Sequence, residues 1–146
     1  MSLYYGSQFT GNETNFTNSG TSGTAYTNVV PRFTEATDVT QLNLPATVLP
    51  INAYEYLFYN SSIERGPNFG VVTSMNNRSV LRMFDGCDQL QYIYWPGSTV
   101  VDSSTGYYWV NGVAENGTFQ ILNSYQSSWS RGESGIPNNW MVLSGD

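Results

Sequence analysis

The chain has 146 residues, of which 15% are aromatic and only 11% are charged, and its formal net charge is −6. All five basic residues are arginines and they are scattered, which disfavours nucleic acid and anionic membrane surfaces as partners, because both require clustered positive charge. Histidine and lysine do not occur, so a Ser-His-Asp triad and Schiff-base chemistry are excluded.

A change in amino-acid composition divides the chain into two parts. Residues 1–40 hold many small polar residues and few apolar ones, which predicts an extended polar N-terminal arm. Residues 41–146 are predicted to form a single all-β domain, and this length is sufficient to bury a core. No window has the apolar character of a signal peptide or a membrane span, so we expect neither a signal peptide nor membrane insertion in the chain as given.

Short segments rich in aromatic and β-branched residues follow one another through the domain, and turn residues separate them. They are residues 54–59, 69–75, 79–84, 90–95, 106–110, 118–122 and 140–143. Pairs such as Asp85-Gly86 and Asn111-Gly112 supply the positive φ angles that tight hairpins need. We therefore predict an antiparallel sandwich or barrel-like meander of about seven to nine short strands, with residues 69–122 as its antiparallel run. No three similar units of the β-trefoil kind are found.

Carboxylates are the groups left for acid-base chemistry or metal binding. Glu55 lies among apolar residues in residues 54–59, and a pair such as Glu55 and Asp102 would be needed for glycoside hydrolysis. Asp85 and Asp88 share one turn and are weak candidates for a calcium site, although Asp-Gly already explains an ordinary turn there. Cys87 between them is interpreted as a small turn residue rather than an exposed thiol.

Aromatic residues occupy both faces of two predicted strands, whereas a strand with one face in water should alternate with polar residues. Either the arm or a long loop at residues 126–139 covers the second face, or some aromatics form a recognition surface for a neighbouring subunit or for sugar rings. The candidates for such a surface are Tyr92, Tyr94, Trp95, Tyr107, Trp109 and Trp129.

The arm is too polar to order itself. Fixing its backbone is unfavourable, and its few aromatic residues bury too little area to offset that loss of entropy. We therefore expect the arm to need another surface, where its aromatic residues would dock. These assembly residues are Tyr4, Tyr5, Phe9, Phe16 and Tyr26.

These features favour a non-enzymatic structural protein without a cofactor. We expect it to form a homo-oligomer or to join a larger protein assembly, as a capsid decoration, fibre or filament subunit at a virion or extracellular surface. The alternative is a lectin-like carbohydrate-binding module that uses exposed tryptophan and tyrosine, with glycans as partners. A glycoside hydrolase with a carboxylate pair ranks third.

Overall fold

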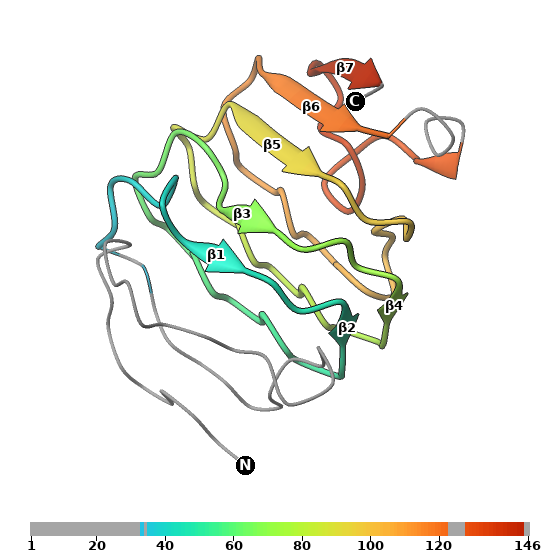
Figure 1. Ribbon diagram of the computed structural model, residues 1–146. Helices are drawn as coiled ribbons and strands as arrows, with labels where there is room; N and C mark the ends of the chain where they lie inside the picture. Colours follow the sequence, from blue (N-terminus) through green and yellow to red (C-terminus); the bar gives the residue numbers. More distant parts are fainter. Residues whose placement is uncertain (1–32, 34, 123–127, 145–146) are drawn as a thin grey trace.

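A computed structural model describes residues 33, 35–122 and 128–144 of the protein (Figure 1). The elements named in this part are all strands, and no helix in it is long and apolar enough to cross a membrane. The strands are β1 (Asn43–Leu44), β2 (Val48–Leu49), β3 (Asn68–Phe69), β4 (Ser74–Met75), β5 (Tyr92–Trp95), β6 (Thr118–Ile121) and β7 (Met141–Ser144). The all-β class predicted from the sequence is therefore confirmed.

The strands pair in parallel, so the predicted antiparallel sandwich or barrel-like meander is wrong. β1 pairs with β3, β2 pairs with β4, and β5, β6 and β7 form one sheet in that order. Parallel neighbours cannot be joined by a hairpin, because the chain must travel back before it can run in the same direction again. The chain therefore winds into a β-solenoid of about four turns, and we call each turn a coil.

Opposite the strands, three of the coils contain a run of consecutive β-turns rather than a strand (Figure 1). These turn ribbons cover residues 51–60, 77–86 and 107–112, where the sequence predicts strands over residues 54–59, 79–84 and 106–110. Successive backbone N–H groups in the first ribbon alternate between two kinds of acceptor, a carbonyl of the same coil and a carbonyl of the next coil. The Leu57 N–H donates to the Tyr54 carbonyl of its own coil (3.2 Å), whereas the Phe58 N–H donates to the Met83 carbonyl of the next (2.9 Å). Successive donors thus close turns and join coils in alternation.

The ribbons place a positive φ at every fourth residue. In the first ribbon these residues are Asn52, Tyr56 and Asn60. The same three positions carry Arg78, Arg82 and Gly86 one coil later, and the third ribbon continues the last two with Tyr108 and Gly112. We call each set of equivalent positions a column. The Asp-Gly and Asn-Gly pairs that suggested hairpins therefore do supply positive φ, but within ribbons that stack in parallel.

Burial in the ribbons follows a period of four, with two residues pointing inward and two outward. Ala53 and Tyr54 are buried, Glu55 and Tyr56 are partly exposed, and the next two residues are buried again. A β-strand alternates with a period of two, so the strand interpretation of these segments assigned half of their residues to the wrong side.

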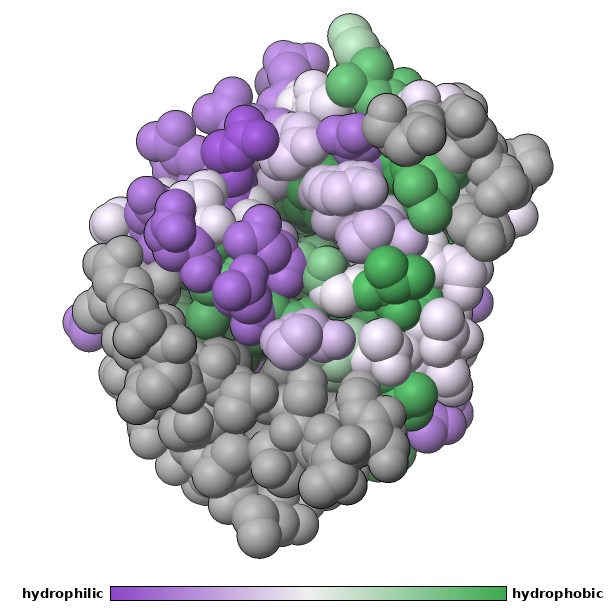
Figure 2. Space-filling view, viewed as in Figure 1, coloured by the Kyte–Doolittle hydropathy of each residue, from purple (hydrophilic) through white to green (hydrophobic). Residues whose placement is uncertain are grey.

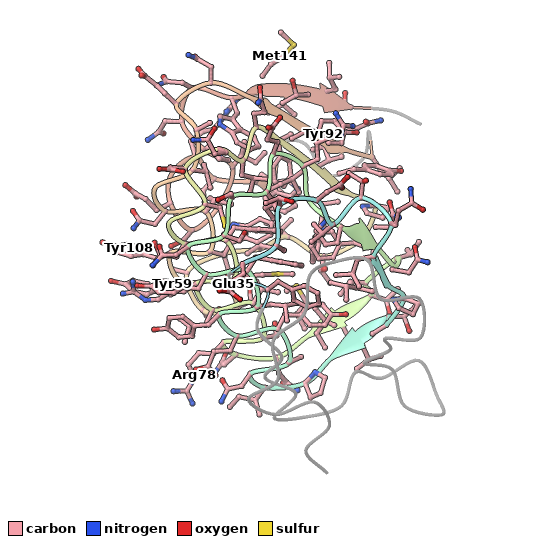
Figure 3. The ribbon with its side chains drawn as sticks, turned by 90° about the vertical axis from the view of Figure 1, so that its left-hand side faces the viewer. Glu35, Tyr59, Arg78, Tyr92, Tyr108 and Met141 are labelled. Carbon is pink, nitrogen blue, oxygen red and sulfur yellow. The ribbon has the colours of Figure 1, made fainter. Side chains whose placement is uncertain are left out.

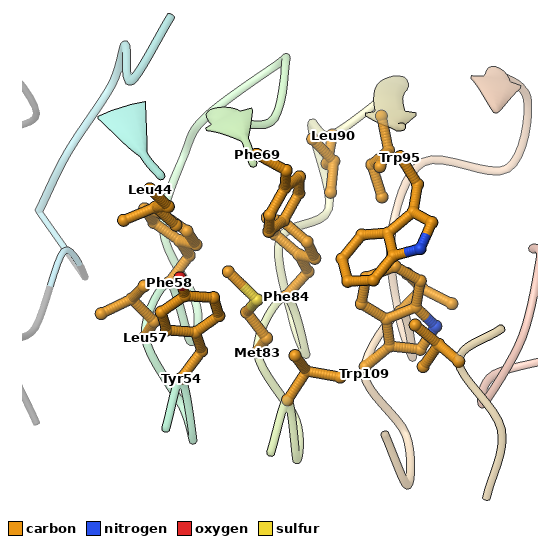
Figure 4. Close-up of a cluster of buried hydrophobic side chains, with 14 of the residues drawn as sticks. Leu44, Tyr54, Leu57, Phe58, Phe69, Met83, Phe84, Leu90, Trp95 and Trp109 are labelled. Atoms are coloured by element: carbon orange, nitrogen blue, oxygen red, sulfur yellow. The ribbon is translucent and has the colours of Figure 1, made fainter. Parts of the chain in front are cut away.

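The core lies between the strands and the ribbons, and aromatic rings connect its coils (Figure 4). Ring centroids of Phe33 and Phe58 are 5.1 Å apart, and Phe58 stacks on Phe84 at 5.4 Å with 7° between the ring planes. Phe84 continues to Trp109 at 5.8 Å. Successive coils thus contribute rings to a continuous series, in keeping with a repeat protein whose coils contact their immediate neighbours.

The boundary predicted at residue 40 falls next to residues that belong to the core. Phe33, Ala36 and Val39 are each buried, with relative exposures of 0%, 1% and 0%. Residues 1–32 lie outside the described residues, so an extended arm there stays a prediction.

One testable consequence concerns Arg78, an exposed residue with a φ of 57°. Asparagine tolerates this region better than other residues with a β-carbon, and Asn52 holds the equivalent place one coil earlier with a φ of 61°. The substitution Arg78→Asn should raise the free energy of unfolding by about 0.5–1 kcal/mol, measured by urea denaturation. The control Arg78→Ala lacks the short polar side chain that lets asparagine tolerate this region, so it should give no gain. Equal stability of the two variants would contradict a backbone origin.

Candidate functional site

The structure separates the aromatic candidates into buried and exposed groups. Trp95, Trp109 and Trp129 have relative exposures of 1%, 0% and 9%, so they present no ring to a partner. The indole N–H of Trp95 donates to the Thr99 carbonyl (2.9 Å), and that of Trp109 donates to the Gly135 carbonyl (2.8 Å). The tyrosines are the accessible members of the set, with Tyr107 43% exposed and both Tyr92 and Tyr94 half-buried.

A first surface lies on the ribbon side, where the side chains of Tyr59 and Tyr108 point outward (Figure 3). We call it the tyrosine–arginine patch, and it consists of Tyr56, Tyr59, Arg82, Tyr107 and Tyr108. Tyr107 and Tyr108 stack at 4.3 Å with 7° between their planes. The Arg82 guanidinium lies 5.1 Å from the Tyr108 ring centroid and 5.6 Å from that of Tyr107. Tyr56 and Tyr59 meet edge to face at 5.2 Å in the preceding coil.

Arg82 is held in place by a carboxylate that is itself fixed. Its Nη1 donates to Asp85 Oδ2 at 2.7 Å, which is the only ion pair among the described residues. Asp85 Oδ1 accepts a hydrogen bond from the Asn111 side chain at 2.9 Å. The hydrogen bond with Asp85 raises the pKa of Arg82 above its ordinary value, so the guanidinium keeps its charge. The patch therefore offers flat aromatic area around one oriented cation.

Four residues of the patch were not among the candidates predicted from the sequence, namely Tyr56, Tyr59, Arg82 and Tyr108. Tyr56, Arg82 and Tyr108 occupy one column of positive φ, with angles of 58°, 49° and 54°. These three residues recur at a spacing of one coil, and this recurrence is the signal in the sequence. The same spacing of 26 residues separates Ser61 and Cys87, whose side chains are hydrogen-bonded to each other. That signal is visible only once the coils are aligned.

A second surface lies on the strand side, at a hollow of about 330 Å³ near β3 and β5. Figure 2 looks onto this side, where hydrophilic side chains border a recess that contains hydrophobic groups. The hollow is lined by Thr40, Arg65, Gly66, Pro67, Asn68, Phe69, Tyr92 and Tyr94. Arg65 lies over the Tyr92 ring at 4.0 Å from its centroid, and the Tyr92 hydroxyl donates to Gln120 Oε1 at 2.6 Å.

The carboxylates considered for catalysis differ in their surroundings, and Asp102 is held by hydrogen bonds within its own turn. Asp102 Oδ1 accepts hydrogen bonds from Ser104 N (2.9 Å) and Thr105 N (3.1 Å), which closes a local turn. Burial alone would raise the pKa of Asp102, but hydrogen bonds from Ser104 and Thr105 outweigh it and lower the pKa. A carboxylate with a lowered pKa is poorly suited to the general-acid role in glycoside hydrolysis. Glu55 is partly exposed in the first ribbon.

The calcium candidates Asp85 and Asp88 do not form a ligand cluster in the structure. Asp85 is already engaged by Arg82 and Asn111, whereas Asp88 is exposed. Within the part of the chain that is described, no three residues of the types Cys, Asp and Glu come together in a way that would hold a metal ion.

Cys87 is buried rather than exposed, and its thiol donates to the Phe58 carbonyl at 2.9 Å. Burial raises the pKa of this thiol from 9.0 to about 11, so at pH 8 only about one molecule in a thousand carries the reactive thiolate. We expect Ellman's reagent to leave native protein unmodified at pH 8 and to label it fully in urea. Rapid labelling of the native protein would contradict this position.

The same pKa difference links Cys87 to stability at high pH. A thiol whose pKa is higher in the folded state favours folding while it is protonated in both states. Its contribution is fully present below pH 9.0 and is lost as the pH rises through about 11. A Cys87→Ala variant should therefore lose less stability than the original chain between these pH values.

Comparison with protein-family models, with curated proteins and with solved structures finds no match to this chain. The arm residues Tyr4, Tyr5, Phe9, Phe16 and Tyr26 lie outside the described residues, and their docking role stays a prediction. The two surfaces described above are therefore the basis for a functional proposal.

Proposed function

We propose that the protein is a non-enzymatic assembly module that associates with further copies of itself through the tyrosine–arginine patch. Tyrosine and arginine are enriched among the residues that dominate binding energy in protein interfaces. The patch combines both with an ion pair that fixes the arginine in advance, which reduces the entropy lost on binding.

The observation that carries the proposal is the choice of residues in the central column of positive φ. The flanking positions are filled mainly by residues that tolerate this conformation, namely Asn52, Asn60, Gly86 and Gly112. The central column instead holds Tyr56, Arg82 and Tyr108, each at a conformational cost of about 1–2 kcal/mol. Their side chains point away from the core, so core packing does not offset this cost. Local strain without a gain in packing is typical of functional positions.

The setting that we propose follows from composition. A chain with few charges and many Asn, Ser, Thr and Gly residues suits a capsid decoration, fibre or filament subunit at a virion or extracellular surface. An N-terminal arm docked on a neighbouring copy would add contacts to those of the patch. Both elements would then act in one homo-oligomer.

Light scattering over a range of protein concentrations tests the proposal. The full chain should associate as concentration rises, and the double variant Tyr107→Ser with Tyr108→Asn should need about tenfold more protein to do so. Asparagine at position 108 suits the positive φ, so the double variant should remain folded. Arg78→Asn, on the same side but outside the patch, is the matched control.

Two outcomes would count against the proposal. A full chain that stays monomeric at every concentration would exclude self-association. Association that is equally strong in the double variant and in the control would exclude the patch as the contact surface. Deletion of residues 2–30 then separates the arm from the patch, since each should weaken association independently.

A further inference from the structure

The hollow on the strand side has features that the assembly proposal does not use. It lies away from the outward-facing side chains of the ribbon side, as the positions of Tyr92, Tyr59 and Tyr108 show (Figure 3). A second hollow of about 230 Å³ adjoins it, since Thr40 and Arg65 line both. The two together form an extended depression rather than a single pocket.

One aromatic ring that lines the larger hollow, that of Tyr92, is held in a fixed orientation. Arg65 covers one face of Tyr92, and the Tyr92 hydroxyl is bonded to Gln120. Tyr94, two residues further along β5, is half-buried on the same outward-facing side of the sheet. Phe69 and Pro67 are buried against the core. The depression thus has rigid aromatic and apolar walls.

Polar groups at the rim keep hydrogen-bonding capacity. The side-chain N–H groups of Asn68 donate to the Thr40 carbonyl (3.0 Å) and to Asn43 Oδ1 (3.1 Å). The oxygen of the same side-chain amide is left as an acceptor. Among the described residues, neither the Tyr94 hydroxyl nor the Arg65 guanidinium forms a hydrogen bond. The rim therefore offers both donors and acceptors in fixed positions.

Charges at the depression are mixed, which argues for an uncharged ligand. Asp38 and Glu64 line the second hollow together with Arg65, and Arg65 forms no ion pair with either within the described residues. Asp38 Oδ1 is fixed as an acceptor by Thr40, whose N–H and hydroxyl donate to it at 2.9 and 2.6 Å. An anionic ligand would meet these two carboxylates, and a cationic one would meet Arg65.

An extended peptide fits this place less well. Peptides commonly add to a sheet by pairing with an open strand edge. The residues of the hollow lie on the face of the sheet, where the backbones of neighbouring coils already bond to each other, as the Gly66 N–H does to the Tyr92 carbonyl at 2.9 Å. A ligand here must be recognised by side chains alone.

We propose that this depression binds an uncharged oligosaccharide. Sugar rings lie against Tyr92 and Tyr94, and their hydroxyl groups bond to Arg65, Asn68 and Asp38. Two adjoining hollows accommodate more than one ring, so a trisaccharide binds more tightly than a monosaccharide of the same type. The buried tryptophans have no part in recognition. This site is independent of the tyrosine–arginine patch.

The test is an array that carries neutral, sialylated and sulfated oligosaccharides, followed by calorimetric titration with the neutral trisaccharide that gives the strongest signal. The full chain should bind neutral glycans. Tyr94→Ala and Arg65→Gln should each weaken binding about tenfold, because a stacked ring or a charged donor is lost. Tyr94→Phe, which preserves packing, should weaken it by a smaller factor and guards against misfolding of the alanine variant.

Arg78→Asn, on the ribbon side but outside the tyrosine–arginine patch, is the matched control and should bind as the original chain does. Three results would overturn the proposal. They are an array without any neutral signal, a signal confined to sialylated or sulfated glycans, and equal binding by the Tyr94 variants, Arg65→Gln and Arg78→Asn. Self-association measured in the same preparations reports separately on the patch.

Discussion

Substituting alanine for Trp109 is expected to lower the free energy of unfolding by about 3–5 kcal/mol, the range for large aromatic residues in a core. The indole is fully buried, and its ring centroid lies 5.8 Å from those of both Phe84 and Trp95 and 6.1 Å from that of Phe119. Truncation opens a cavity where three coils meet. The Gly135 carbonyl also loses the indole N–H that donates to it at 2.8 Å.

The matched control is Tyr107→Ala, two residues earlier in the same ribbon. Tyr107 is 43% exposed and stacks on Tyr108, so its removal should lower the free energy of unfolding by only about 1 kcal/mol. Urea denaturation followed by tryptophan fluorescence and by circular dichroism measures both variants. Similar losses for the two would contradict the inward orientation of Trp109.

Gly70→Ala is the second variant with a large expected effect. A β-carbon at Gly70 would lie 2.5 Å from the Pro45 carbonyl oxygen and 2.8 Å from that of Ala46, both backbone atoms of the preceding coil. The Gly70 N–H also donates to the Leu44 carbonyl at 2.8 Å, so the coils cannot separate without straining that bond. We expect a loss of up to about 3 kcal/mol in the free energy of unfolding.

Gly66→Ala is the control, because it adds the same methyl group on the same strand-side segment. Its β-carbon would find its nearest neighbours at 3.7 Å, an ordinary van der Waals distance. Its stability should stay within about 0.5 kcal/mol of the original chain in thermal and urea denaturation. If both alanine variants are equally stable, close stacking of the first two coils at Gly70 is refuted.

The sequence was sufficient to predict the all-β class, because short aromatic and β-branched segments between turn residues have no helical period. It was not sufficient to predict which strands are neighbours. Asp85-Gly86 and Asn111-Gly112 supply the same backbone angles in a hairpin and in a turn ribbon, so local chemistry cannot distinguish the two. A turn ribbon is distinguished from a hairpin by equivalent residues that recur about one coil apart. The number of residues in that spacing varies along this chain.

The candidate surfaces were predictable to a smaller extent. An excess of aromatic residues indicated that some would be exposed, and Tyr107 is exposed. The alternation of a β-strand would place Trp109 on the same face as Tyr107. In the ribbon, Trp109 points inward and Tyr107 points outward. Arg82 has no distinguishing neighbours in the sequence. Its place beside Tyr107 and Tyr108 depends on a ribbon one coil away.

The period of four in the ribbons also limits how the length of this chain can change. Inserting one residue in a ribbon would turn a buried position such as Phe58 or Phe84 toward water and bring a polar neighbour into the core. Inserting a whole coil would preserve every inward and outward position and would extend both the ribbon side and the strand side. Growth by complete coils is therefore the change in length that this architecture tolerates best, and the two candidate surfaces would lengthen in the same increments.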